Sequence, residues 1–265
     1  MVPSEFQLRQ DICEVGRRIY QHGFVASNDG NISIRLNEKE VLATPTGVSK
    51  GFMTPEMLVK VNMQGEQLSG QLKPSSELKM HLEIYRQRPD VRAVVHAHPP
   101  TATGFAVAGI PLDRCVLPEI IINLGSIPLV AYGTPSTDEV PAAVKEYIGS
   151  HDALLLANHG ALTVGTDVYN AYYKMESLEL FAKISLTARL LGNENVLSAE
   201  QVYKLMEIRA RAGVTSPNPG CVDCGACSVS TREAPAATGI TEEELREIIT
   251  NVTRRVLTSL GDRKQ

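Results

Sequence analysis

The stretch Val94-Val95-His96-Ala97-His98-Pro99-Pro100 decides how this chain is organised. The apolar run 91–96 predicts a buried β-strand, and the two histidines come at its end. Side chains two residues apart on a strand point to the same face, so both imidazoles can reach one metal ion. The stretch therefore predicts a metal site at the end of a strand.

A third histidine occupies a similar position. The run 153–157, Ala-Leu-Leu-Leu-Ala, is followed directly by Asn158-His159-Gly160. A single histidine in such a place is more often a hydrogen-bonded core residue. Three histidines at strand ends reverse that preference. They predict one zinc ion held by His96, His98 and His159, with an open fourth position.

The composition excludes several classes of function. The 265 residues are 43% hydrophobic and 21% charged with a net charge of −4, so the chain has no basic surface for nucleic acid. The N-terminus lacks the apolar core of a signal peptide, and no apolar run approaches the roughly 20 residues of a membrane-spanning helix. Cys13 and Cys115 lie in apolar segments and read as reduced core thiols. We expect a cytoplasmic protein with no nucleic-acid partner and no membrane partner.

Strands and helices alternate along most of the chain. Apolar residues at three- and four-residue spacing predict helices, and alternating or continuous apolar runs predict strands. The predicted helices are 4–24, 75–88, 101–107, 137–148 and 168–191, and the predicted strands are 32–36, 40–44, 58–62, 91–96, 127–131 and 153–157. Ser75 or Ser76 can cap the second helix. This interleaving predicts an α/β body.

The character of the sequence changes near residue 214. Residues 216–220, Ser-Pro-Asn-Pro-Gly, and the Ala/Pro-rich stretch after them hold too little apolar surface to order themselves. Residues 241–244, Thr-Glu-Glu-Glu, then form a capping box that opens an amphipathic helix. The predicted organisation is a catalytic domain at 1–213, a flexible linker at 214–239 and an amphipathic helix at 240–265.

Three cysteines of the linker, Cys221, Cys224 and Cys227, have the spacing of half a ferredoxin-type motif. The fourth cysteine of that motif and the proline after it are missing. Reduced, solvated cysteines are the simpler interpretation, and a three-thiolate iron–sulfur cluster or second zinc site is the alternative.

A metal alone does not make an active site, which also needs a substrate clamp and a proton-transfer group. Small turn residues can cradle a phosphate through hydroxyl, amide and backbone N–H groups, without lysine. The candidates are Gly30, Asn31, Thr46, Gly47, Ser75 and Ser76. Each pair taken alone is more often a plain turn or helix cap. Glu77 places a carboxylate beside the cradle. A carboxylate in the first turn of a helix also interacts favourably with the helix dipole, which is the alternative reason for an acidic residue there.

Taken together and in order, these motifs resemble the class II aldolase and adducin family. They are Ser27-Asn28-Asp29-Gly30-Asn31-Ile32-Ser33, Thr44-Pro45-Thr46-Gly47, Lys73-Pro74-Ser75-Ser76-Glu77, Val95-His96-Ala97-His98 and Asn158-His159-Gly160. The resemblance covers about residues 5–213 and is strongest to the fuculose-phosphate aldolases of the family. It implies a three-layer αβα body with a central mixed, largely antiparallel sheet, assembled as a homotetramer with active sites near subunit boundaries.

The resemblance also implies roles for residues. His96, His98 and His159 would hold one catalytic zinc ion per subunit, and Glu77 would be the acid/base. Asn31, Thr46, Gly47, Ser75 and Ser76 match the positions that bind the substrate phosphate. The implied reaction cleaves a phosphorylated sugar, L-fuculose 1-phosphate or L-rhamnulose 1-phosphate, to dihydroxyacetone phosphate and L-lactaldehyde. Returning a proton to carbon would favour a raised pKa for Glu77.

Two alternatives and one departure accompany this interpretation. An L-ribulose-5-phosphate 4-epimerase-like enzyme would use the same bond cleavage, but such epimerases carry Asp at the position of Glu77. A non-catalytic adducin-type interaction module would have lost the metal residues, which are present here. The family's tyrosines on the aldehyde side are absent from 113–118 and 209–213. Glu119 and Tyr132 are candidates to replace them, and the identity of the sugar stays open.

The helix within 240–265 and its linker resemble the encapsulation peptides that direct enzymes into bacterial microcompartments. A helix of about 20 residues is marginal alone and gains stability by docking its apolar stripe on a partner. A microcompartment shell or cargo protein is one such partner, and the enzyme's own tetramer is the alternative. In the first case the protein would lie inside a microcompartment within the cytoplasm.

Overall fold

The computed structural model describes residues 3–215. These residues lie within one compact unit of the chain, Met1–Cys227. The predicted linker beyond residue 215 and its cysteines Cys221, Cys224 and Cys227 lie outside the described residues, as does the predicted helix within 240–265.

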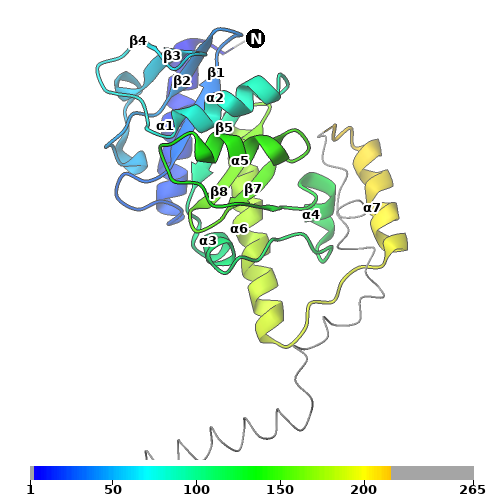
Figure 1. Ribbon diagram of the computed structural model, residues 1–265. Helices are drawn as coiled ribbons and strands as arrows, with labels where there is room; N and C mark the ends of the chain where they lie inside the picture. The colour runs from blue at the N-terminus through cyan, green and yellow to red at the C-terminus, as the bar shows by residue number, and fades with distance from the viewer. Residues whose placement is uncertain (1–2, 216–265) are drawn as a thin grey trace, which may run out of the picture. The chain divides into compact units, whose positions relative to one another are not determined.

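An eight-stranded sheet forms the middle of the described unit (Figure 1). Its order is β4-β3-β2-β1-β5-β8-β7-β6, and every neighbouring pair is antiparallel except β6 and β7. The strands are β1 Asn31–Arg35, β2 Glu40–Ala43, β3 Val59–Asn62, β4 Gln67–Ser69, β5 Ala93–Ala97, β6 Leu129–Val130, β7 Ala153–Leu156 and β8 Gly160–Gly165. The prediction of an α/β fold with a mixed, largely antiparallel sheet is confirmed.

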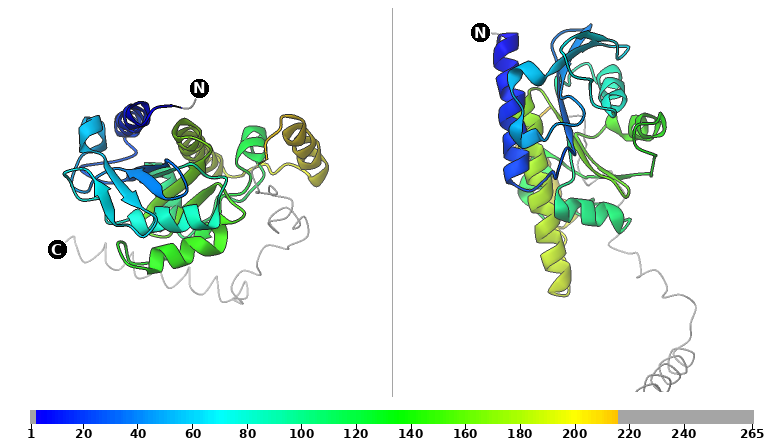
Figure 2. Two further views of the ribbon diagram at one scale, coloured as in Figure 1. Left: turned by 90° about the horizontal axis from the view of Figure 1, so that it is seen from above. Right: turned by 90° about the vertical axis from the view of Figure 1, so that its left-hand side faces the viewer.

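Helices cover both faces of this sheet, which gives three layers (Figure 2). Helices α1, α3 and α6 pack on one face, and α2 and α5 pack on the other. The helices are α1 Glu5–Gln21, α2 Leu78–Gln87, α3 Pro100–Val107, α4 Pro118–Asn123, α5 Glu139–Ile148, α6 Val168–Leu190 and α7 Ala199–Arg211, with short 3₁₀ turns η1 Lys50–Phe52 and η2 Pro55–Met57.

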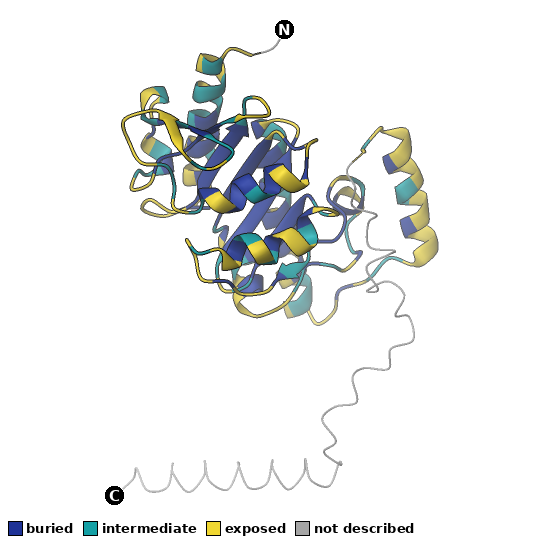
Figure 3. Ribbon diagram, turned by 45° about the horizontal axis from the view of Figure 1, so that its top comes forward, coloured by how far each residue is buried: buried dark blue, intermediate teal, exposed yellow. Residues whose placement is uncertain are grey.

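Alternation along β5 explains why two separate cores form. Val95 and Ala97 pack into the cluster of α1, α3 and α6, whereas Val94 packs into the cluster of α2 and α5. His96 has the parity of Val94, so its side chain lies on the α2 face. Strands β5, β7 and β8, in the middle of the sheet, are buried on both faces (Figure 3). Their sequences are therefore nearly continuous apolar runs.

The structure corrects the predicted start of the second helix. Helix α2 begins at Leu78, and its N-cap is Glu77, whose side chain makes no capping hydrogen bond. Ser75 and Ser76 therefore precede the helix in a turn rather than capping it. In that turn the Ser75 hydroxyl accepts from the Glu77 N–H at 3.3 Å. The Ser76 hydroxyl and the Glu77 carboxylate are left for contacts outside the helix.

The sequence pattern does not predict four of the elements: β4, β8, α4 and α7. Strand β8 lies between β5 and β7, near the middle of the sheet. Its sequence, Gly-Ala-Leu-Thr-Val-Gly, carries glycine at both ends, which is typical of loops rather than strands. Tertiary pairing on both sides overrides that weak local preference. The predicted strand 127–131 shortens to the two residues of β6.

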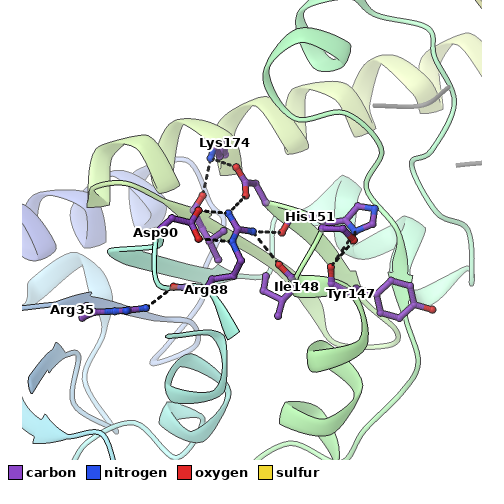
Figure 4. Close-up of polar contacts among 10 residues, drawn as sticks. Arg35, Arg88, Asp90, Tyr147, Ile148, His151 and Lys174 are labelled. Atoms are coloured by element: carbon purple, nitrogen blue, oxygen red, sulfur yellow. Dashed lines mark hydrogen bonds and ion pairs between the residues drawn. The ribbon is translucent and has the colours of Figure 1, made fainter. Parts of the chain in front are cut away.

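An ion-pair network built on the buried side chains of Arg88 and Asp152 lies where β5 and β7 begin (Figure 4). Arg88 donates from its guanidinium to both carboxylate oxygens of Asp90 at 2.8 and 2.7 Å, and to Asp152 at 2.9 Å. Lys174 donates to the other oxygen of Asp152 at 2.6 Å and to the carbonyl of Val164. The network ties β7 and α6 to the loop before β5. Within residues 3–215, no helix is both long enough and apolar enough to cross a membrane.

Candidate functional site

The sheet brings three histidines from two separate segments to one place. His96 and His98 lie at the C-terminal end of β5, and His159 lies in the turn between β7 and β8. Because β5 and β7 both run antiparallel to β8, their C-terminal ends point to the same end of the sheet. The pairing of Ala97 with Ala161 fixes this register.

The geometry of the three rings fits a metal ion. Within residues 3–215, one ligand nitrogen from each of His96, His98 and His159 lies within 4.8 Å of the other two. The Nε2 atoms of His96 and His98 are 3.3 Å apart. Two nitrogens on a tetrahedral zinc ion, at about 2.0–2.1 Å from it, would be separated by roughly 3.4 Å. The donor set suits zinc and related divalent metals.

Hydrogen bonds and burial hold the rings in the state that binds a metal. The Nδ1–H of His96 donates to the carbonyl of Ala161 at 2.9 Å, which leaves Nε2 as the free donor of a lone pair. Burial lowers the pKa of His96 to about 3. Burial and the nearby His159 also lower the pKa of His98. Both rings are therefore neutral at pH 7, which is the ligating form.

The turn that carries His159 is strained and tightly packed. Asn158 has a φ of 56°, a left-handed conformation that residues other than glycine rarely adopt. A Cβ atom on Gly160 would lie 2.5 Å from Cδ2 of His98 and 2.6 Å from the carbonyl oxygen of Ala97. Glycine is therefore required at 160 for the two histidine segments to approach each other. Strain of this kind is typical of functional sites.

Glu77 lies beside the three histidines. Its Oε1 is 3.1 Å from Nε2 of His159, and its Oε2 is 3.4 Å from Nε2 of His96. The side-chain amide of Asn31 donates to Oε2 at 2.8 Å. Asn31 is placed for this contact because it pairs directly with His96 across β1 and β5. One carboxylate thus links the three histidines to the predicted phosphate cradle.

The predicted direction of the Glu77 pKa shift is wrong. Burial acts to raise the pKa of Glu77, but electrostatic attraction to the neighbouring His96 and His159 rings and hydrogen bonds from His159 and Asn31 outweigh burial and lower that pKa. No local pattern indicates this shift, because Asn31 and His159 are 46 and 82 residues away from Glu77 in the chain. The carboxylate is therefore ionised at neutral pH.

The predicted phosphate cradle also comes together. Its three turns are joined by backbone contacts: Ser75 N–H donates to the carbonyl of Thr44 at 3.2 Å, Thr46 N–H donates to the carbonyl of Lys73, and Pro45 pairs with Pro74. Thr44 accepts in turn from Ile32 N–H through its hydroxyl at 3.1 Å. Gly30 and Asn31 are buried, whereas Thr46, Gly47 and Ser76 are exposed and Ser75 is half-buried. The exposed groups can receive a ligand from solvent.

Several buried polar atoms around the site have no hydrogen-bond partner among the described residues. They are Oδ1 of Asn31, Nδ1 of His159 and Nε2 of His81. A buried polar group without a partner costs about 1–3 kcal/mol, so such groups are rare unless a ligand or water completes them. Their gathering around Glu77 and the histidines is the arrangement expected where a ligand completes buried polar groups.

Sequence reasoning missed three residues that support the site. Asp29 lies 3.7 Å from Nδ1 of His98, and buried Glu179 accepts from the N–H groups of Thr101 and Ala102 just after the His98 turn. Fully buried His81 contacts the Ser33 hydroxyl at 2.7 Å. For His81 a signal existed, because it lies in the apolar stripe of α2. Glu179 offered none, since its partners are 77 and 78 residues away.

The remaining predicted residues are placed as follows. Tyr132 follows β6, whose parallel pairing with β7 puts it at the same end of the sheet as His159, and its side chain is 59% exposed. Glu119 is exposed on α4. Cys115 is buried and Cys13 is half-buried. Cys221, Cys224 and Cys227 lie outside the described part of the chain.

The chain is similar in sequence to a known family of enzymes and to individual members of it. The family described as Class II Aldolase and Adducin N-terminal domain matches residues 10–186. The 3-oxo-tetronate 4-phosphate decarboxylase of Escherichia coli K12 is 35% identical over 207 residues, which are 76% of this chain and 96% of that protein. The L-fuculose phosphate aldolase of Methanococcus maripaludis is 35% identical over 175 residues, 66% of this chain and 94% of that protein.

A solved structure gives the same result for the fold. The crystal structure of L-fuculose-1-phosphate aldolase from Thermus thermophilus has 32% sequence identity and a TM-score of 0.63. The match covers 72% of this chain and 99% of that one. The chain therefore belongs to the class II aldolase and adducin family.

Proposed function

We propose that this protein is a zinc-dependent lyase that cleaves L-fuculose 1-phosphate or L-rhamnulose 1-phosphate to dihydroxyacetone phosphate and L-lactaldehyde. The observation that carries the proposal is the position of Glu77. Its carboxylate contacts two of the three converging histidines and the Asn31 amide at the edge of the cradle. Bound substrate would therefore have its phosphate in the cradle and its ketone beside the histidines.

His96, His98 and His159 would hold the zinc ion, one per subunit. A divalent metal there would polarise the substrate ketone and stabilise the negative charge that develops on its oxygen. Thr46, Ser75 and Ser76 would orient the phosphate through hydroxyl and backbone N–H groups.

Glu77 moves the proton in this scheme. Because its carboxylate is ionised, it can remove a proton from the carbon of dihydroxyacetone phosphate in the direction of aldol addition. In cleavage the C3–C4 bond breaks, the C4 hydroxyl gives up its proton as the aldehyde forms, and that proton, relayed to Glu77, would be delivered to C3 of the three-carbon product. The Asn31 amide holds the carboxylate in the orientation for both steps.

A second candidate reaction is decarboxylation of a 3-oxo acid phosphate. Two observations favour it: relatives such as the Escherichia coli enzyme carry that name, and segments 113–118 and 209–213 contain no tyrosine. Loss of carbon dioxide from 3-oxo-tetronate 4-phosphate would leave the same three-carbon enediolate as cleavage of the ketose phosphate. Carbon dioxide departs without exchanging a proton with the enzyme, so no group is needed on the aldehyde side.

One experiment separates these reactions. The zinc-loaded protein is incubated with L-fuculose 1-phosphate, L-rhamnulose 1-phosphate and 3-oxo-tetronate 4-phosphate, and dihydroxyacetone phosphate is measured. Epimerisation of L-ribulose 5-phosphate is followed in parallel, and Glu77→Gln is the control. Release from a ketose phosphate that Glu77→Gln abolishes supports the aldolase. Release only from the oxo acid supports the decarboxylase, turnover only of the ribulose phosphate supports the epimerase, and no turnover supports an adducin-type module.

Assembly and location extend the proposal. We infer a cytoplasmic homotetramer whose segment 214–265 directs it to a microcompartment shell or cargo protein. Deleting 214–265 should preserve lyase activity and abolish co-purification with shells, and loss of activity would contradict this assignment. For Cys221, Cys224 and Cys227, metal content that falls in a triple Cys→Ser variant would support a cluster or second zinc site.

A further inference from the structure

Lys50 is a buried cation next to the phosphate cradle. It lies in η1, three residues after Gly47, and only 1% of its surface is exposed. None of the six predicted cradle residues carries a positive charge. Lys50 therefore differs in charge from every group assigned to phosphate binding.

Its ammonium group joins two of the cradle's turns. Nζ donates to the carbonyl of Asn28 at 2.9 Å and to the carbonyl of Val48 at 2.8 Å. Asn28 comes two residues before Gly30, and Val48 comes directly after Gly47. A single side chain thus fixes the spacing of the turns that carry Asn31 and Thr46.

The backbone of Lys50 is itself held against α1. A Cβ atom on Gly16 would lie only 2.6 Å from the carbonyl oxygen of Lys50, and one on Gly51 would lie 2.5 Å from the ring of Tyr20. The two glycines let η1 and α1 pack with their backbones close together. With its backbone fixed on this side, the Lys50 side chain extends toward the cradle.

The charge of Lys50 has no direct counter-ion within residues 3–215, since both atoms that accept from Nζ are neutral carbonyls. Burial lowers the pKa of Lys50 to about 8. The carboxylates of Asp29 and Glu77 act to raise that pKa, but burial has the larger effect. A buried ammonium of this kind is costly unless an anion approaches it. Substrate phosphate in the neighbouring cradle would supply that anion.

We propose that Lys50 is a positioning residue for phosphate recognition, which ties the 28–31 and 46–48 turns together and places a buried positive charge behind the bound phosphate. The inference rests on the proposed function, because that function places a phosphate in the cradle. Lys50 acts through the two turns and through its field, without contacting the reacting carbons.

The test compares two ligands that differ only in the phosphate. Dissociation constants of dihydroxyacetone phosphate and of dihydroxyacetone are measured by calorimetry for the zinc-loaded full-length wild type, Lys50→Met and Lys50→Gln. Lys60→Met is the matched control, because Lys60 lies on β3 and pairs with Glu5, away from the cradle. We expect Lys50→Met to weaken the phosphorylated ligand on the order of 10- to 100-fold. Binding of dihydroxyacetone should change less than about twofold.

Gln at position 50 can still donate to one carbonyl but carries no charge. Lys50→Gln should therefore also lose affinity for the phosphorylated ligand. Equal affinity in wild type and both variants would overturn the inference and leave the proposed function standing. Loss of both ligands in parallel would also overturn it, because it would show a purely structural role. A wild type that does not bind dihydroxyacetone phosphate would contradict the proposed function itself.

A second measurement needs no variant. In a crystal structure of the wild type with dihydroxyacetone phosphate, the phosphorus atom should lie within about 8 Å of Lys50 Nζ, where two unit charges still interact appreciably. A phosphate bound in another part of the molecule would overturn the inference even if both variants failed to fold.

Discussion

Two polar clusters lie at opposite ends of the same strands, and they differ in how completely their groups are paired. Where β5 and β7 begin, Arg88, Asp90, Asp152 and Lys174 form a closed network of charge-assisted hydrogen bonds (Figure 4). Where the strands end, Glu77 and three histidines lie among buried atoms that lack partners within the described residues.

The difference separates a structural cluster from a functional one. Every charged group of the Arg88 network pairs with an opposite charge within the network. No charge there is left for a ligand to neutralise. The histidine cluster instead has converging lone pairs and unsatisfied groups, which are costly to the folded protein until a ligand completes them. Mutations should therefore affect stability at the first end and chemistry at the second.

The sharpest test of the comparison is Glu77→Gln. The amide keeps the shape of the carboxylate but cannot accept a proton, so kcat should fall by about 10²- to 10⁴-fold. The melting temperature should change little, because no buried ion pair of the other cluster is broken. Steady-state kinetics and thermal unfolding measure the two quantities. A much lower melting temperature with an unchanged kcat would contradict the prediction, because it would give Glu77 the structural role and not the chemical one.

Asp152→Asn tests the other end of the strands. It leaves Arg88 and Lys174 buried without their shared counter-ion, so unfolding free energy should fall by about 3–5 kcal/mol. The kcat of the remaining folded protein should be unchanged. Denaturant unfolding gives the stability, and Asp138→Asn is the matched control, since Asp138 pairs with Lys79 on the surface. Equal stability of the two variants would contradict the assignment of a structural role.

The carboxylate of Asp152, in the Arg88 network, should also make the stability of the protein depend on pH. Burial acts to raise the pKa of Asp152, but Lys174 and Arg88 outweigh it and the net shift is downward. A carboxylate with a lowered folded pKa stabilises the protein above its unfolded pKa of about 3.9 and loses that contribution as pH falls through the folded value. The stability gap between wild type and Asp152→Asn should therefore be constant from about pH 5 to 8 and close in more acidic solution. A gap that widens on acidification would exclude this origin.

The smallest effect is expected at Asp29. Its carboxylate is half-exposed and 3.7 Å from Nδ1 of His98, so it supports that ring only weakly. Asp29→Asn should weaken zinc binding by about tenfold, the low end of what removal of such a supporting group costs. Competition with a chromogenic chelator measures this affinity. A loss as large as that of His98→Ala would mean that Asp29 itself binds the metal.

Local pattern was enough to predict much of the fold and of the site. Helix α1, strands β1, β2, β3, β5 and β7, and helix α6 follow from their periodicity within a few residues. His96, His98 and His159 could be selected because each lies where an apolar run ends. Strand β8 could not be predicted, since its glycine-flanked sequence has no strong preference until β5 and β7 pair with it.

The sequence by itself determined which chemistry is available, because residue types and their order along the strands are local properties. It supplied the histidines, the carboxylate of Glu77 and the small turn residues that resemble one family. Only the tertiary structure decided the electrostatics. The lowered pKa of Glu77, the lowered pKa of His96 and the burial of Lys50 depend on groups tens of residues away in the chain. A pKa reports the surroundings of a group, and folding alone creates those surroundings.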